Sequence, residues 1–244
     1  MSREHFVSRG LIAGPELKVQ GMPWQKVPVL HISPDALTAK VLCRRHNEAL
    51  SPLDSEALRV FEALRAARVH ATRRSLSTRP WATIISGHAL ELWALKTMAG
   101  FCASGMDFEF GGHRLSDFEL PLPEIAKILT DPVPRSIVSL DIPGEMEAHE
   151  STLGRTAVTI LWEVDTDAHQ LSAMVVRMHG VGFKFHLKPS GTAQDGDSFV
   201  RPHILDVIGP RRKSRLYLGW PDMTPGRYIF FRLKGDGPAS MTAP

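Results

Sequence analysis

The sequence predicts an α+β protein with an N-terminal part of short strands and one helix, a helical middle, and a C-terminal antiparallel β region. Two patterns of apolar residues carry this prediction. Between about residues 52 and 104 apolar side chains recur every three or four positions or fill every face, as in helices. Beyond about residue 135 they alternate with period two, as in strands. A rigid break at Asp131-Pro132-Val133-Pro134 separates the patterns, so we divide the chain into residues 1–75, 76–134 and 135–244.

The composition indicates a globular protein without a membrane-spanning segment. With 244 residues, 43% of them hydrophobic, the chain can bury a substantial core. The net charge of +3 does not by itself predict nucleic-acid binding, which would need a local basic patch. The longest apolar stretch, residues 89–103, contains Glu91 and Lys96 and is too short and too charged to cross a bilayer. The two cysteines give no disulfide framework, so we expect a cytoplasmic protein.

The N-terminal part combines short extended segments with one long helix. We expect strands over residues 17–20, 27–32 and 37–43. The spacing of apolar residues then predicts a helix over residues 52–72. Ser51 suits the N-cap of this helix and Pro52 its first position, because both residue types are favoured there.

The middle of the chain is expected to supply the centre of the core. A strand over residues 81–85 leads into a helix from residue 88 or 89 to 104, and a short helix follows over residues 123–129. The first of these helices is apolar on nearly all faces, which is typical of a buried helix. We expect its large apolar residues to be largely buried: Leu92, Trp93, Leu95 and Met98. Glu91 and Lys96 on the same helix are expected to lie at its rim or to pair with a partner.

The C-terminal region predicts a series of strands joined by hairpins. The expected strands cover residues 156–164, 171–178, 181–187, 204–208, 215–220 and 227–233. Breaks at residues 165–169 and at His179-Gly180 suit antiparallel hairpins.

One stretch concentrates residue types that can bind a metal ion. Cys43, His46 and Asn47 place a soft ligand, an imidazole and an amide within five residues, between a predicted strand and a predicted helix. Such a stretch is half of a metal site, and the other half must come from elsewhere in the fold. The best candidate for that other half is Ser2-Arg3-Glu4-His5-Phe6-Val7.

Together these S-x-E-H and C-x-x-H-N segments resemble the HNH (ββα-metal) endonuclease superfamily, and most of all bacterial HNH-like proteins of unassigned role. The resemblance covers roughly residues 2–65 and implies an N-terminal ββα finger. It implies that His5 is the general base, with Glu4 and Asn47 holding Mg²⁺ or a similar divalent ion. Cys43 and His46 match the second half of the zinc knuckle that braces the finger in many members.

The sequence departs from the family pattern in three places. The first knuckle of the family, a C-x-x-C just before the S-x-E-H segment, has no counterpart here, because the given sequence begins at Met1. Cys43 and His46 alone cannot close a structural zinc site, which needs four ligands. The position of the family's middle Asn falls near Thr38, and the usual Gly-rich loop is missing. Either the chain starts downstream of its true beginning, or the finger is a remnant. In the second case Cys43 is a small buried residue beneath the finger rather than a zinc ligand.

Two basic clusters are candidates for contact with nucleic acid. The first is Arg44 and Arg45, inside the Cys-x-x-His segment. The second precedes a predicted strand that carries Tyr217 and Trp220, and it consists of Arg211, Arg212, Lys213 and Arg215. Basic residues beside aromatic ones fit contacts with phosphates and bases, although an ordinary basic β-turn accounts for the same run.

These observations support two hypotheses from different classes of protein. In the first, the chain is a metal-dependent endonuclease, or the remnant of one, that hydrolyses phosphodiester bonds of nucleic acid. In the second, the chain is a non-catalytic binding protein in which the finger is a scaffold and the β region recognises a ligand or partner. The Glu4-His5 pair favours the first hypothesis, and the missing knuckle favours the second.

Overall fold

The computed structural model describes residues 2–5, 7–12, 17–19, 30–33, 35, 38–72, 80–104, 109–110, 113–114, 117–118, 120, 122–130, 138–141, 158–187, 201–209, 212–221 and 227–232. Its helical elements are η1 (Arg9–Leu11, a 3-10 turn), α1 (Arg44–Thr72), α2 (Gly87–Ala103) and α3 (Leu122–Thr130). Its strands in the first two thirds of the chain are β1 (Ser2–His5), β2 (Leu17–Val19), β3 (Leu30–Ile32), β4 (Thr38–Leu42), β5 (Trp81–Ser86), β6 (Glu109–Phe110), β7 (His113–Arg114), β8 (Val138–Asp141) and β9 (Thr159–Asp165). The remaining strands are β10 (Gln170–Met178), β11 (Val181–Leu187), β12 (Pro202–Ile208), β13 (Lys213–Gly219) and β14 (Arg227–Arg232).

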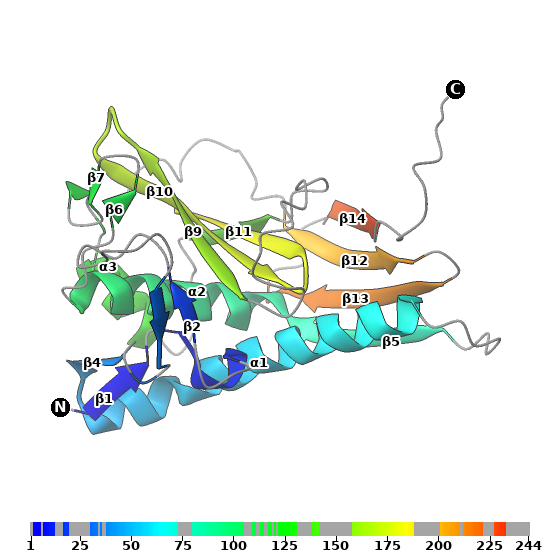
Figure 1. Cartoon of the computed structure of the whole chain (residues 1–244), viewed down its shortest axis with the longest axis horizontal. Coiled ribbons are helices and arrows are strands. Elements are labelled where there is room, and N and C mark those ends of the chain that lie inside the picture. The colour runs from blue at the N-terminus through cyan, green and yellow to red at the C-terminus, as the bar shows by residue number, and fades with distance from the viewer. Residues whose placement is uncertain are drawn as a thin grey trace.

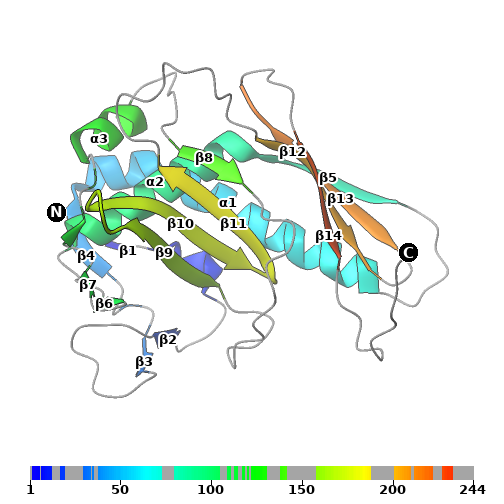
Figure 2. The ribbon, with the colours of Figure 1, turned by 90° about the horizontal axis from the view of Figure 1, so that it is seen from above.

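Two four-stranded sheets pack against a pair of helices, which confirms the α+β class. The first sheet has the order β8-β11-β10-β9, and the second has the order β14-β12-β13-β5. In Figure 1 the long helix α1 runs along the molecule, with β1 and β4 near its N-terminal end and β12 and β13 beside its C-terminal half. Figure 2 shows the first sheet lying across α2, with the second sheet at the end of the molecule where α1 finishes.

The prediction of an antiparallel C-terminal region is correct for the first sheet and wrong for part of the second. All ladders of the first sheet are antiparallel, and the β10–β11 hairpin turns at His179 and Gly180, both with positive φ, as a two-residue hairpin requires. In the second sheet β12 and β13 are antiparallel, but β14 pairs parallel to β12 and β5 pairs parallel to β13. Alternation of apolar residues identifies a strand without fixing its direction, so the sequence pattern missed the parallel pairs.

Helix α1 begins eight residues before the predicted start at Pro52. It starts at Arg44, so that Ser51 and Pro52 lie inside the helix. Proline has no N–H, so the carbonyl of Glu48, one turn earlier, loses its usual donor. The Ser51 hydroxyl donates to this Glu48 oxygen at 2.9 Å and thereby replaces the missing bond. Two residue types that commonly begin a helix are therefore tolerated within this one.

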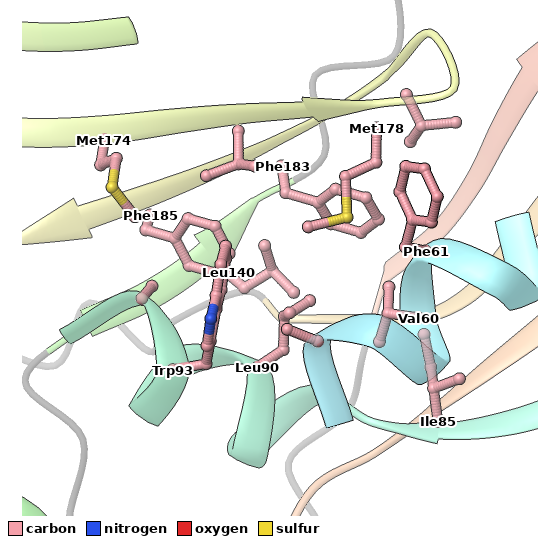
Figure 3. Close-up of a cluster of buried hydrophobic side chains, with 14 of the residues drawn as sticks. Val60, Phe61, Ile85, Leu90, Trp93, Leu140, Met174, Met178, Phe183 and Phe185 are labelled. Atoms are coloured by element: carbon pink, nitrogen blue, oxygen red, sulfur yellow. The ribbon is translucent and has the colours of Figure 1, made fainter. Parts of the chain in front are cut away.

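Helix α2 lies at the centre of the core, as predicted. Trp93, Leu95 and Met98 are fully buried, and Leu92 is half-buried against the same cluster. Figure 3 shows the Trp93 ring rising from α2 toward Phe185 of β11, with residues of the first sheet above it. The two charged residues of α2 are buried and paired, as expected. Glu91 accepts from Arg201, with Arg201 Nε at 2.9 Å from Oε1, and Lys96 donates to Asp54 at 2.5 Å.

Side chains of α1 cover the edge of the second sheet at β5. The Arg59 guanidinium donates to the Ile84 carbonyl at 3.0 Å, and Glu56 accepts from the Ser86 N–H at 2.9 Å. Both residues therefore satisfy backbone groups of an edge strand that would otherwise be open to pairing with another chain. The same helix also packs on β13 and β12, so it contacts three strands of the second sheet.

One hydrophobic cluster contains residues from all three predicted segments of the chain. It includes Val7 and Leu64 from the first segment, Trp93 from the second, and Phe183 and Leu216 from the third. The division at residues 75 and 134 remains a prediction, and its Pro-rich boundary at residues 131–134 lies outside the described residues. No helix in the described part of the chain is both long enough and apolar enough to cross a membrane.

Candidate functional site

The S-x-E-H segment forms β1, and β1 pairs with the strand that leads into α1. β1 and β4 are antiparallel, with Ser2 opposite Leu42, Glu4 opposite Ala39 and His5 opposite Thr38. The ladder carries an irregularity between Ser2 and Glu4, where β4 has one more residue than β1. This pairing joins two segments that are more than thirty residues apart in the sequence.

The C-x-x-H-N segment forms the junction between β4 and α1. β4 ends at Leu42 and α1 begins at Arg44, so Cys43 is the single residue between strand and helix. The Asn47 N–H donates to the Cys43 carbonyl at 3.0 Å, which closes the first helical turn. The helix contacts both β1 and β4. The two predicted metal-binding segments therefore lie on paired strands and at the start of the helix that follows, and the predicted ββα finger stays a prediction.

His5 sits at the end of β1 beside a carboxylate. Its Nε2 lies 3.8 Å from Oδ1 of Asp35, and its side chain is 27% exposed. Its Nδ1 is buried and makes no hydrogen bond to the part of the chain that the structure describes. A carboxylate beside Nε2 favours the tautomer that carries its proton there. Nδ1 then keeps an uncommitted lone pair, which is the form that a general base needs.

Asp35 is a candidate functional residue that the sequence did not indicate. It lies just before β4, where the Thr38 hydroxyl donates to its carbonyl at 2.8 Å and its own N–H donates to the Ser33 hydroxyl at 3.3 Å. Because β1 and β4 are antiparallel, the residues that precede β4 lie beside the residue that ends β1. Knowledge of that pairing would have pointed to Asp35, and nothing in its local sequence does.

Cys43 and His46 lie side by side at the junction of β4 and α1. Cys43 Sγ lies 3.3 Å from His46 Nδ1, and both residues are exposed. Their spacing of three places them on one face of the first helical turn, where side chains three apart are neighbours. The alternative prediction, that Cys43 is a small buried residue beneath the finger, is wrong, because this cysteine is exposed at the junction of β4 and α1.

For the other two predicted ligands, Glu4 and Asn47, the structure gives the position in the fold. Glu4 pairs with Ala39 in the β1–β4 ladder, and Asn47 is half-buried in the first turn of α1. The predicted convergence of Glu4, His5 and Asn47 on one ion stays a prediction. Among the described residues, no three His, Cys, Asp or Glu side chains gather as a metal site. Glu4 and Asn47 nevertheless carry carboxylate and amide oxygens, the kinds of ligand that Mg²⁺ prefers, so their chemistry fits this ion.

The predicted nucleic-acid contacts fall in two separate places. Arg44 and Arg45 are exposed at the start of α1, and Arg44 pairs with Glu48 at 2.7 Å. Of the second cluster, Arg211 lies outside the described residues, and Arg212 is half-buried in the turn before β13. The two clusters lie near opposite ends of α1, because β13 packs beside its C-terminal half (Figure 1).

Lys213 and Arg215 lie on one face of β13, but a buried carboxylate neutralises part of their charge. Arg215 forms two hydrogen bonds to fully buried Asp206, at 2.7 and 3.0 Å, and Lys213 lies 3.3 Å from the same carboxylate. The hydrogen bonds to Asp206 raise the pKa of Arg215 above its ordinary value, so its guanidinium stays charged. Arg215 therefore anchors β13 to β12, while half-exposed Lys213 is the more accessible cation.

The same outer face of the second sheet exposes apolar side chains. Tyr217 stands opposite Ile84 on one side and opposite Ile204 on the other. Ile84 is 65% exposed and Tyr217 is 38% exposed, whereas Ile204 is half-buried. The Arg215 guanidinium lies 5.9 Å from the centre of the Tyr217 ring. This row of side chains, which we call the Tyr217 row, resembles a surface for stacking or packing rather than an ordinary solvated sheet face.

A buried polar network ties the N-terminal unit to the helices. The Ser8 hydroxyl donates to Asp54 of α1 at 2.5 Å and accepts from the Trp93 indole of α2 at 2.8 Å. Lys96 donates to the other oxygen of Asp54. Ser8 follows β1 by three residues, so these bonds fix the chain just beyond His5. The network thus holds the chain in place three residues beyond His5.

Comparisons of the chain with protein-family models, with curated proteins and with solved structures find no match.

Proposed function

We propose that the protein is a metal-dependent endonuclease of the HNH type, which hydrolyses phosphodiester bonds of nucleic acid. The observation that carries the proposal is the antiparallel pairing of β1 with β4, followed directly by α1. This pairing joins the S-x-E-H and C-x-x-H-N segments, as a ββα-metal finger would. The resemblance rested on two short motifs, and their association in space is a separate observation that supports it.

His5 is the proposed general base. Imidazole is the side chain that most often serves as a general base in enzymes. Asp35 would hold the proton on Nε2 and leave Nδ1 to accept another. Since Nδ1 is buried in this structure, the ring must turn, or substrate must displace its neighbours, before water can reach the atom. Asp35 is therefore proposed as the residue that orients His5.

Glu4 and Asn47 are the proposed holders of Mg²⁺ or a similar divalent ion. When bound, such an ion supplies positive charge that stabilises the negative charge developing on the phosphate. Arg45, exposed in the same helical turn as Asn47, is suited to contact the phosphate backbone. Arg44 contributes less, because Glu48 already neutralises it.

Plasmid nicking with matched histidine variants tests the proposal. We expect the purified protein to nick supercoiled DNA with Mg²⁺ or Mn²⁺, and His5→Ala to lower the rate by about 10²–10⁴-fold, as loss of a general base does. His169→Asn is the matched control, because His169 lies in the exposed β9–β10 turn with a positive φ that asparagine tolerates. This control is expected to cleave at the wild-type rate.

Two results would overturn the proposal. One is the absence of cleavage of duplex and single-stranded DNA with every divalent ion tried. The other is cleavage that persists unchanged in His5→Ala, which would indicate a contaminating nuclease or a different site. Circular dichroism of each variant shows whether the fold is intact.

The Tyr217 row favours a second candidate function, a non-catalytic protein that binds single-stranded nucleic acid. An exposed tyrosine on the same face of β13 as Lys213 offers a stacking surface, with a cation further along the strand for phosphate contact. If this function is correct, the protein binds labelled oligonucleotides without cleaving them. Tyr217→Ala then weakens binding by about 5- to 150-fold, since stacking on one aromatic ring contributes about 1–3 kcal/mol. Binding that is unaffected by this change would exclude the candidate.

A further inference from the structure

Strand β5 is the last strand of the second sheet in the described part of the chain, and its sequence favours pairing with another strand. Its six residues, Trp81-Ala-Thr-Ile-Ile-Ser86, are mostly aromatic or β-branched, and none is charged, proline or glycine. Short segments of this composition are typical of strands that pair with copies of themselves. At an open sheet edge such a strand is a site of association with another chain, unless the fold blocks it.

Two charged side chains of α1 block the outer side of β5. The Arg59 guanidinium donates to the Ile84 carbonyl at 3.0 Å, and Glu56 accepts from the Ser86 N–H at 2.9 Å. Because Ile84 and Ser86 are two residues apart, their backbone groups point to the same side of the strand, away from β13. Glu56 and Arg59 also form an ion pair at 3.5 Å. A further strand would therefore have to displace both charges before it could pair with β5.

A second copy of the chain is the partner that this edge fits. In an antiparallel pair of β5 strands centred on Ile84, this residue faces Ile84 of the second copy, and Ala82 faces Ser86 of the second copy. None of these residues is charged, so the pair brings no like charges together. Ile84 is exposed and lies opposite Tyr217, so the pair would also join the Tyr217 rows of the two copies across a two-fold axis.

We propose that β5 is a self-pairing edge and that the Glu56–Arg59 pair keeps it closed to β5 of a second copy. The two side chains satisfy the Ile84 and Ser86 backbone groups within one chain, so these groups gain little from a second strand. An incoming strand would also remove both charges from their hydrogen bonds and from part of their water. The inference does not rest on cleavage or binding of nucleic acid, because Glu56 and Arg59 have no part in either proposed function.

Removal of both charges tests the proposal in the whole chain. Glu56→Ala/Arg59→Ala keeps α1 helical, because alanine is the best helix former, and it leaves the edge of β5 unguarded. This double variant is expected to form dimers and larger species as its concentration rises through the micromolar range, whereas the wild-type protein keeps one sedimentation coefficient. Sedimentation velocity measures the association, and thioflavin T fluorescence reports larger species that extend the sheet.

The same helix supplies a matched control. Glu62 and Arg65 form an ion pair of the same residue types and the same spacing, at 2.7 Å, and both side chains are exposed. Among the described residues this pair contacts its own helix rather than β5. Glu62→Ala/Arg65→Ala removes the same charges, and it is expected to sediment as the wild-type protein does.

A third substitution distinguishes strand pairing from loss of folding. Ile84→Lys places like charges directly opposite each other at the centre of the proposed pair, which is destabilising. Ile84 is exposed, so the change leaves the core intact. Added to Glu56→Ala/Arg59→Ala, it is expected to restore the single sedimentation coefficient of the wild-type protein. Association that came from partial unfolding would persist in this triple variant.

Any one of three results would refute the proposal. They are a Glu56→Ala/Arg59→Ala protein that does not associate, equal association of Glu62→Ala/Arg65→Ala, and association that persists after Ile84→Lys. The nicking assay with His5→Ala is read independently. Failure here therefore leaves the proposed nuclease function standing, and failure there leaves the guarded edge standing.

Discussion

Cys102, half-buried near the C-terminal end of α2, shows how burial changes the chemistry of a single side chain. Burial raises the pKa of its thiol from 9.0 to about 11, because the thiolate is poorly solvated there. In the unfolded chain the thiol ionises near its ordinary pKa. Between about pH 9 and pH 11 the unfolded state therefore binds fewer protons than the folded state, and the free energy of unfolding falls as the pH rises.

This difference predicts a pH effect that belongs to one residue. Two pKa units correspond to at most about 2–3 kcal/mol of lost stability between pH 9 and pH 11. Cys102→Ser keeps the size of the side chain but removes the ionisation, so its free energy of unfolding should fall less over the same range. Urea unfolding of both proteins at a series of pH values measures the difference. Parallel pH profiles for the two proteins would contradict the prediction.

For single residues, the sequence could indicate that a charged side chain is paired, but it could not identify the residue that pairs with it. Glu91 and Lys96 were expected to lie at the rim or to be paired, and each is buried with an ion-pair partner. The partners, Arg201 and Asp54, come from distant parts of the chain, and no local pattern identifies them. Asp35 was missed for the same reason, since it approaches His5 only through the pairing of β1 with β4.

Among the secondary-structure elements, α2 is the one whose burial at the centre of the core can be tested most directly. Trp93 is fully buried, and its indole donates to Ser8, which lies outside the helix. Trp93→Ala is expected to lower the free energy of unfolding by about 3–5 kcal/mol, because a large cavity remains. Trp93→Phe fills most of that space and is expected to cost less. A loss below about 1 kcal/mol for Trp93→Ala, measured by chemical denaturation, would mean that α2 is peripheral.

Helices and strands with a regular spacing of apolar residues could be predicted from the sequence. The residues at which they end and the strands with which they pair could not. The predicted strand at residues 81–85 and the helix that follows it agree with β5 and α2 within a few residues. The start of α1 was missed because Ser51 and Pro52 are favoured at helix N-termini, whereas here the Ser51 hydroxyl compensates for the proline within the helix. β8 was not predicted, since four residues carry too little pattern to stand out.

At the scale of the whole molecule, one hydrophobic cluster joins parts that the sequence pattern separated. β5 precedes α2 in the chain but pairs with β13, and the second sheet is therefore completed by a strand from the predicted middle segment. A sequence pattern reports local periodicity, and it contains no information about which strands will meet. The class and the approximate order of elements could be predicted, whereas the sheet topology required the structure.

The candidate site illustrates the same limit. The two motifs could be identified from the sequence, and their association through β1 and β4 could be expected only from the resemblance. The contact between Cys43 and His46 followed from their spacing of three, because they occupy one helical turn. The approach of Glu4 and His5 to Asn47 depends on how α1 crosses the two strands, and spacing alone does not determine that crossing.

We propose that Glu4, His5 and Asn47 form one metal-dependent site, and a crystal structure grown with Mn²⁺ tests this proposal most directly. Mn²⁺ replaces Mg²⁺ at oxygen ligands, and its anomalous scattering locates the ion without reference to the chain. We expect an ion about 2.0–2.3 Å from a Glu4 oxygen and from the Asn47 amide oxygen, with His5 beside it. His5 more than about 10 Å from Asn47, or Mn²⁺ bound only elsewhere, would contradict the claim.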